Sequence, residues 1–266
     1  MNYQVKEIWC KNQNKKIYGL AYIPTREASS IANEASSSKY PLVIFSHELG
    51  SSHKVGKKYA DHFASQGIAY YVFDYCGGSA DSFGNKSDGD SLDMSLRSEY
   101  SDLTAVYETA SKWDFVDPDR IYLHGGSQGG LLSGIFAARH KETIAGLIML
   151  YPALSIRNYA RSHFDSKEDI PEKFWYIDLI WVGKNYILDA WDLDVESELS
   201  PYEGPILLMH GDADPVVKCI ESDKASKYLK NCEYHRISGG LHGFKGQALE
   251  DAYRYMEGYF RAQNIL

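Results

Sequence analysis

The hydrophobic positions of this chain fall into short, unbroken apolar runs that are separated by polar and glycine-rich segments. Runs without alternation are typical of parallel strands that are covered on both faces. Segments with helical periodicity lie between them. The succession of strand, helix and strand along the chain predicts an α/β fold whose mostly parallel central sheet has helices on both faces. The predicted strands are 41–47, 68–75, 121–123, 144–151, 205–209 and 233–237, and the predicted helices are 55–66, 96–113, 129–139, 219–229 and 249–262.

Two parts of the chain depart from this rhythm. Residues 5–10 and 17–23 read as two strands joined by a short polar turn, which predicts an antiparallel start to the sheet. Residues 153–204 are too long for one crossover and are strongly aromatic. We expect them to form a small helical cap, or lid, over the carboxyl edge of the sheet, within one domain that spans 1–266. A polar loop is expected at 25–39.

Some of the cap aromatics are expected to line a pocket, because insertions at this edge of an α/β sheet usually cover the site. The candidates are Tyr159, Trp175 and Trp181. The alternative is that these side chains only pack the insertion onto the body of the protein.

The apolar run at 121–123 ends in Gly-Gly-Ser-Gln-Gly at 125–129, which matches the G-x-S-x-G nucleophile elbow. In such an elbow the serine, here Ser127, sits on a strained strand-to-helix turn, and glycines stand where a Cβ would clash. A glycine-rich packing turn and a phosphate-binding loop are the alternatives. The Walker pattern requires Lys-Ser/Thr, but Leu131 and Leu132 follow here, and the dinucleotide pattern does not fit these glycines.

An acid and a histidine follow two later strands. Asp214 lies shortly after the strand at 205–209, and His242 lies in a glycine-rich loop after the strand at 233–237. The order Ser…Asp…His is that of the α/β-hydrolase triad. His242 would take the serine proton and Asp214 would hold the imidazole tautomer. Asp212 is the alternative orienting acid, in which case Asp214 would cap the next helix.

Composition limits the partners. The formal net charge is −8 and the sequence pI is about 5.6, which argues against nucleic acid and anionic membrane surfaces. The four cysteines form no C-x-x-C pair and no metal-type spacing. The amino terminus has no apolar core of a signal peptide, and the longest apolar run, 144–150, is too short to span a bilayer. We therefore expect a cytoplasmic protein without a metal.

These motifs resemble the α/β-hydrolase-fold serine esterases, and the chain is most similar to the compact bacterial cinnamoyl/feruloyl esterases and their dienelactone-hydrolase and serine-aminopeptidase-like neighbours. The resemblance covers about 40–260 and is carried by 45–50, 125–129, 210–214 and 240–244. It implies that the backbone N–H groups of Leu49 and Gln128 form the oxyanion hole, and that no cofactor is needed.

The sequence departs from these families in the oxyanion loop, where His47-Glu48 stands in place of the usual His-Gly. A glutamate restricts the backbone and brings a carboxylate near the site. We count His47 and Glu48 among the pocket candidates. Gly126 before the serine and the loop 76–84 also differ from the usual pattern.

Three functions follow from the resemblance. The first is a serine carboxylic-ester hydrolase that forms an acyl-enzyme on hydroxycinnamate or short-chain acyl esters. The second is a small aminopeptidase-like serine peptidase of the same fold. The third is a non-catalytic ligand-binding homologue, which only Glu48 supports. The expected partner is a small-molecule ester, and the sequence leaves a homodimer open.

Overall fold

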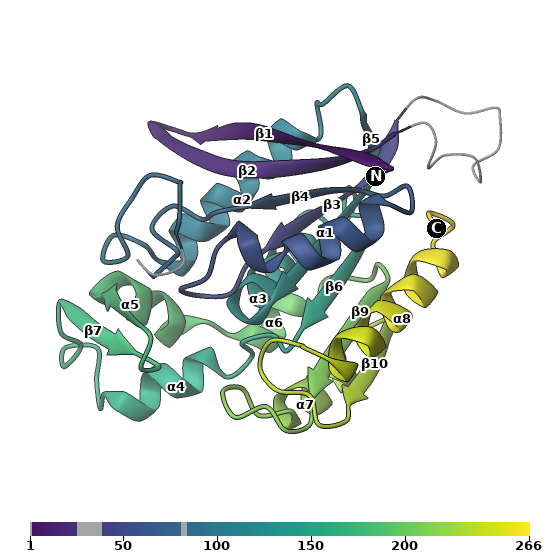
Figure 1. The fold of residues 1–266 in the computed structure, drawn as a ribbon. Helices are drawn as coiled ribbons and strands as arrows, with labels where there is room; N and C mark the ends of the chain where they lie inside the picture. Colours follow the sequence, from purple (N-terminus) through teal and green to yellow (C-terminus); the bar gives the residue numbers. More distant parts are fainter. Residues whose placement is uncertain (1, 26–38, 81–83) are drawn as a thin grey trace.

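The computed structural model describes residues 2–25, 39–80 and 84–266. The predicted polar loop at 25–39 lies almost wholly outside these residues. The described residues form one eight-stranded sheet in the order β1-β2-β4-β3-β5-β6-β9-β10 (Figure 1). β2 is antiparallel to both of its neighbours, β1 and β4. Every later pair of neighbouring strands in this order is parallel. The predicted fold class is confirmed.

The strands match the apolar runs closely. Their bounds are β1 Tyr3–Asn12, β2 Lys15–Pro24, β3 Tyr40–Ser46, β4 Ala69–Phe73, β5 Val116–Gly126, β6 Gly146–Leu150, β9 Ile206–Gly211 and β10 Cys232–Ile237. β5 begins earlier than predicted, because the polar residues 117–119 lie within the strand at a shift of its register against β3.

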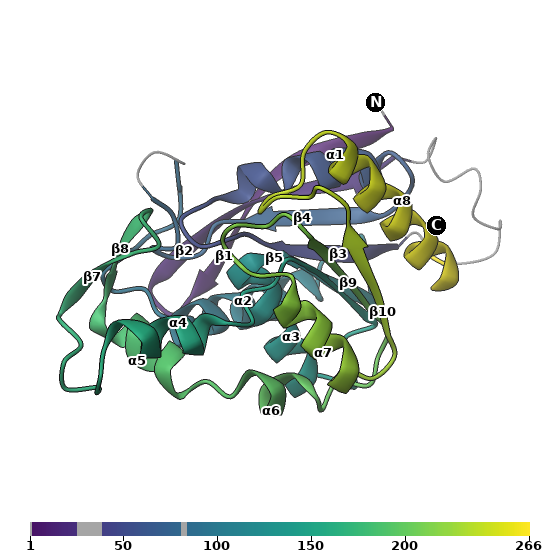
Figure 2. The same cartoon turned by 90° about the horizontal axis from the view of Figure 1, so that it is seen from below.

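Helices cover both faces of the sheet, as Figure 2 shows from below. α1 and α8 pack on one face, and α2, α3 and α7 pack on the other. A short 3₁₀ turn, His53–Val55, precedes α1. The bounds are α1 Lys57–Ala64, α2 Leu96–Ala110, α3 Ser127–Arg139, α7 Ile220–Tyr228 and α8 Gln247–Ala262. Among the described residues, none of the helices combines the length and apolar character needed to cross a membrane.

β4 shows why the apolar runs do not alternate with polar residues. All five of its residues are buried. Tyr70 and Val72 belong to the core under α1 and α8, and Tyr71 and Phe73 belong to the core under α2 and α3. Both faces of the strand bury apolar area, so hydrophobic residues are favoured at every position.

Most of the inserted segment 153–204 gathers at one end of the sheet, at the lower left of Figure 1. It contains α4, Ile156–His163, then a hairpin of β7, Lys173–Tyr176, and β8, Ile180–Gly183, followed by α5, Lys184–Asp192, and α6, Val195–Leu199. The predicted helical cap thus contains three helices, together with a hairpin that was not predicted.

The hairpin forms because two short aromatic and β-branched runs favour strand conformation. They are joined at Ile177 and Asp178, whose φ angles are +48° and +55°. The pair Ile177-Asp178 is not one of the Asn-Gly or Asp-Gly pairs that mark such a turn, so the sequence pattern did not reveal it.

Candidate active site

The carboxyl ends of four neighbouring strands meet at one edge of the sheet. Gly126 of β5 pairs with Leu150 of β6, and Leu150 pairs with Met209 of β9. In the next pair, His210 lies opposite Arg236 of β10. The loops that follow these residues therefore leave the sheet side by side, which brings together segments from 127 to 244.

Ser127 lies on a strained turn between β5 and α3. Its φ is +49°, in the left-handed region that a residue with a Cβ rarely adopts. Ser127 is the first residue of α3, and Gly126 is the N-cap. The helix dipole and free N–H groups at this end favour negative charge. The serine is 8% exposed.

The two outer glycines of the elbow permit close backbone contacts. A Cβ on Gly125 would lie 2.3 Å from the carbonyl oxygen of Gly129. A Cβ on Gly129 would lie 2.2 Å from the carbonyl oxygen of Ser46, at the end of β3. The start of α3 therefore packs directly on the loop that carries Leu49.

Replacing Gly129 by alanine is expected to lower the free energy of unfolding by about 1–3 kcal/mol, because backbone must move to admit the methyl group. Urea denaturation measures this change. Gly258→Ala is the matched control, since no atom outside its own stretch of α8 lies within 4 Å of the added Cβ. That substitution is expected to stabilise the helix. Equal stability of Gly129→Ala and the wild type would contradict the tight elbow.

His242 and Asp214 are paired. His242 Nδ1 lies 2.7 Å from Asp214 Oδ2, so Nδ1 donates and Nε2 is left as a proton acceptor. The backbone N–H groups of Val216 and Val217 donate to Asp214 Oδ1 at 2.8 and 3.0 Å. Burial raises the pKa of Asp214, but hydrogen bonds from His210 and His242 outweigh it and hold the pKa well below its usual range.

His210, near the carboxyl end of β9, is fully buried. Its Nε2 lies 2.9 Å from the carbonyl oxygen of Val217 and 3.3 Å from Asp214 Oδ2. Its Nδ1 lies 2.7 Å from Ser222 Oγ. The four-residue spacing from His210 to Asp214 was visible in the sequence, but only the loop geometry shows the contact.

Asp212 takes a different role from Asp214. Its Oδ1 accepts a hydrogen bond of 2.7 Å from the backbone N–H of Gly239. The N–H of Ala213 donates to the carbonyl oxygen of Gly240 at 3.1 Å. These bonds join the loop after β9 to the loop that carries His242, so Asp212 holds the two loops together.

Tyr151 is a site residue that sequence reasoning missed. It follows β6 at the same sheet edge, with a φ of +38°. Its ring centroid lies 4.8 Å from that of His242, and its hydroxyl donates to Glu48 Oε1 at 2.9 Å. Glu48 Oε1 would lie 2.6 Å from a Cβ on Gly126. The Glu48 carboxylate thus sits beside the elbow, held by Tyr151.

His47 is 1% exposed and both of its ring nitrogens contact backbone. The N–H of Tyr75 donates to Nε2 at 3.0 Å, so Nδ1 carries the proton that it donates to the carbonyl oxygen of Glu48 at 2.7 Å. Burial lowers the pKa of His47, which favours this neutral tautomer. His47 therefore fixes the loop of Glu48 and Leu49.

The two residues with candidate oxyanion N–H groups are both buried, with Leu49 7% and Gln128 2% exposed. The side chain of Gln128 is held at both ends. Its Nε2 donates to a carboxylate oxygen of Glu99 on α2, and its Oε1 accepts from the hydroxyl of Tyr186 on α5. Sequence analysis gave no sign of either partner.

The cap aromatics lie in two different settings. Trp175 and Trp181 are cross-strand neighbours on the hairpin and are 41% and 46% exposed. Tyr159 accepts a hydrogen bond of 3.2 Å from the N–H of Ile177 and packs on Tyr176. Their role in a pocket stays a prediction.

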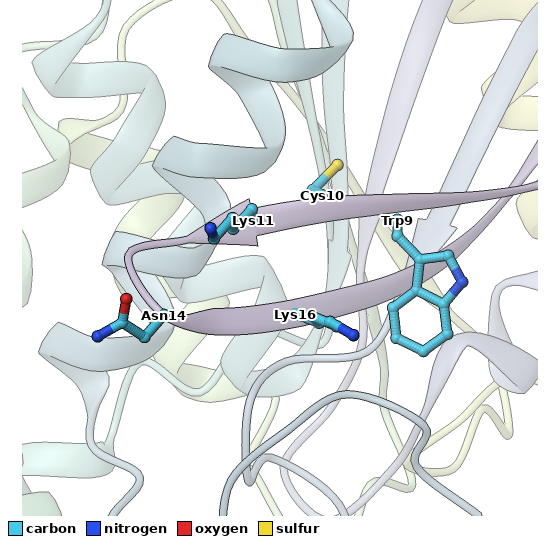
Figure 3. Close-up of a pocket in the computed structure, with 5 residues that line it drawn as sticks. All are labelled: Trp9, Cys10, Lys11, Asn14 and Lys16. Atoms are coloured by element: carbon cyan, nitrogen blue, oxygen red, sulfur yellow. The ribbon is translucent and has the colours of Figure 1, made fainter.

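Two cavities lie away from this edge. One of about 520 Å³ lies along the β1–β2 hairpin (Figure 3). One of about 230 Å³ lies between α2, α3 and α5 and includes Arg97, Leu132 and Asp189. Neither has Ser127 or His242 in its lining. Across 2–25, 39–80 and 84–266, no group of three or more His, Cys, Asp or Glu side chains is arranged to hold a metal ion.

Comparison with protein-family models gives two matches. The prolyl oligopeptidase family matches residues 56–264, and platelet-activating factor acetylhydrolase, isoform II, matches residues 2–84. A curated relative is the quorum-quenching protein AidA of Acinetobacter baumannii (strain MDR-ZJ06), which is 27% identical over 110 residues. That match covers 41% of this chain but only 31% of AidA.

Solved structures match over nearly the whole chain. Est1E from Butyrivibrio proteoclasticus, with ferulic acid bound, is 27% identical with a TM-score of 0.85, covering 97% of this chain and 100% of Est1E. DcsB, in complex with its substrate analogue, is 18% identical with a TM-score of 0.74, covering 98% of this chain and 100% of DcsB, and shows the fold alone. The chain belongs to the prolyl oligopeptidase family and is a serine hydrolase of the α/β-hydrolase fold.

Proposed function

We propose that this protein hydrolyses carboxylic esters, with Ser127 as nucleophile, His242 as general base and acid, and Asp214 as the residue that orients His242. The observation that carries the proposal is the pairing of His242 Nδ1 with buried Asp214 at 2.7 Å, at the sheet edge where Ser127 begins α3. This pairing leaves His242 Nε2 available for the serine proton.

The reaction would run in two halves. Ser127 Oγ bonds to the ester carbonyl carbon while His242 Nε2 takes its proton, and the carbonyl oxygen becomes an oxyanion. The oxyanion accepts hydrogen bonds from the backbone N–H groups of Leu49 and Gln128. The C–O bond to the alcohol then breaks, and His242 protonates the leaving alcohol. Water attacks the acyl-enzyme by the same steps in reverse, which releases the acid and restores Ser127.

A hydroxycinnamate or a short acyl chain is the proposed acyl group. Support comes from Est1E, which binds ferulic acid and matches 97% of this chain. The aromatic side chains of the inserted segment would suit a flat aromatic acyl group. Trp175, Trp181 and Tyr159 are the residues we propose for this contact.

Amide hydrolysis is the second candidate, and the match to the prolyl oligopeptidase family favours it. The same three side chains would cleave an amide, with His242 protonating the leaving amine. We favour the ester because Est1E, which matches 97% of this chain with a TM-score of 0.85, holds ferulic acid.

The proposal also includes a small-molecule partner and a reducing compartment such as the cytoplasm. All four cysteines are free thiols, two of them buried. Free thiols persist where disulfide formation is disfavoured.

Hydrolysis of a substrate panel tests the proposal. The panel comprises p-nitrophenyl acetate, butyrate, octanoate and decanoate, methyl ferulate, and alanine p-nitroanilide. We expect kcat/KM to be highest for methyl ferulate or the short p-nitrophenyl esters, and about 100-fold or more lower for the anilide. A preference for the anilide would favour the peptidase. Absence of turnover on every substrate would favour a ligand-binding protein.

A further inference from the structure

Gln128 is joined by its side chain to two parts of the protein that are far apart in the sequence. Its Nε2 donates to Glu99 on α2, and its Oε1 accepts from Tyr186 on α5, in the inserted segment. Glu99, Gln128 and Tyr186 are 1%, 2% and 0% exposed. Water therefore cannot easily replace either partner, and loss of one would leave a buried polar group unsatisfied.

We propose that Glu99 and Tyr186 are positioning residues that hold Gln128 so that its backbone N–H points at the oxyanion. Because Tyr186 belongs to the inserted segment, fast catalysis then requires this segment to be packed in place. This proposal rests on the proposed ester hydrolysis. A side chain fixed at both ends restricts its own peptide group, and oxyanion stabilisation depends on donors that need no reorganisation.

Tyr186 is itself held by the hairpin of the inserted segment. Its ring packs at 5.0 Å and 75° against Tyr176 of β7, and Tyr176 packs at 4.7 Å against Tyr159 of α4. Displacement of this segment would therefore remove the Tyr186 hydroxyl from Gln128. A series of contacts therefore leads from Tyr159 through Tyr176 and Tyr186 to Gln128, the residue after the nucleophile.

The protonation state of Glu99 gives the proposal a second measurable consequence, a pH dependence of kcat. Burial raises the pKa of Glu99 to about 8, against the opposing effect of the hydrogen bond from Gln128. The titratable groups that face it are Asp102 on α2, His47 and Tyr75 in the loops after β3 and β4, and Tyr186. Burial lowers the pKa of His47 and raises those of Tyr75 and Tyr186 well above 10.

Ionisation of Glu99 would place a negative charge beside the residue that stabilises the oxyanion. We therefore expect kcat of the wild type to fall as the pH rises through about 8. Glu99→Gln keeps an uncharged oxygen acceptor, so it is expected to retain most of kcat at pH 7 and to lose this alkaline fall.

The experiment measures kcat, KM and the inhibition constant of butylboronic acid, whose tetrahedral adduct with Ser127 mimics the oxyanion. Glu99→Leu and Tyr186→Phe are each expected to lower kcat about tenfold, with KM nearly unchanged and boronate inhibition weakened in parallel. The control is Tyr202→Phe, because Tyr202 is also buried and its hydroxyl donates to the carbonyl oxygen of Ile144 at 3.1 Å.

Thermal unfolding separates positioning from stability. Tyr202→Phe is expected to lower the melting temperature without lowering kcat. If Glu99→Leu and Tyr186→Phe lower the melting temperature but leave kcat at the wild-type value, the positioning role is overturned while ester hydrolysis stands. If the wild type turns over no ester at all, the proposed function itself has failed.

Discussion

Ser127→Ala is expected to lower kcat/KM for p-nitrophenyl butyrate by about four to six orders of magnitude. Without the hydroxyl no acyl-enzyme forms, and only positioning and oxyanion stabilisation of a direct water attack remain. Steady-state kinetics measures the loss. Mass spectrometry after treatment with a phosphonate ester should show one adduct on the wild type and none on the variant.

Ser133→Ala is the matched control for this prediction. Ser133 lies on the same helix, α3, and is fully buried, with no hydrogen-bond partner for its hydroxyl among the described residues. Its removal is expected to leave kcat/KM unchanged. Retention of more than about 1% of the activity by Ser127→Ala would contradict a serine mechanism.

The second large effect is expected for Asp214→Asn, which should lower kcat by about 10⁴. The asparagine amide would donate to His242 Nδ1, so the imidazole would carry its proton on Nε2 and could no longer accept that of Ser127. The change is isosteric, and the melting temperature is expected to fall less than the activity does.

Asp212→Asn decides between the two acids. Asparagine keeps an oxygen that accepts from the N–H of Gly239, the contact that Asp212 makes at 2.7 Å. We expect kcat to stay within about threefold of the wild type. A greater loss for Asp212→Asn than for Asp214→Asn would assign the orienting role to Asp212.

The sequence predicted the order of strands and helices because both faces of the parallel strands are buried, which leaves unbroken apolar runs. It also predicted that Ser127, Asp214 and His242 leave the sheet at one edge, because parallel strands share their carboxyl edge. The distance between His242 and Asp214 then follows from loops that are tied together at Asp212.

The remaining features depend on packing between distant segments. Glu99, Gln128 and Tyr186 meet only when α2, α3 and α5 are assembled. No local pattern marks such a contact, because a glutamate on an amphipathic helix is usually exposed. The hairpin of β7 and β8 escaped prediction for a local reason, the unusual turn at Ile177 and Asp178.

The position of the inserted segment in the chain has a consequence for how this protein can diversify. It leaves after β6 and returns at β9, and these strands are paired neighbours. Its two ends are therefore anchored by the sheet. Lengthening a connection between anchored ends costs little entropy, about 0.6 kcal/mol for each doubling. Insertions here can reshape what the protein accepts, whereas Gly125 and Gly129 leave no room for change.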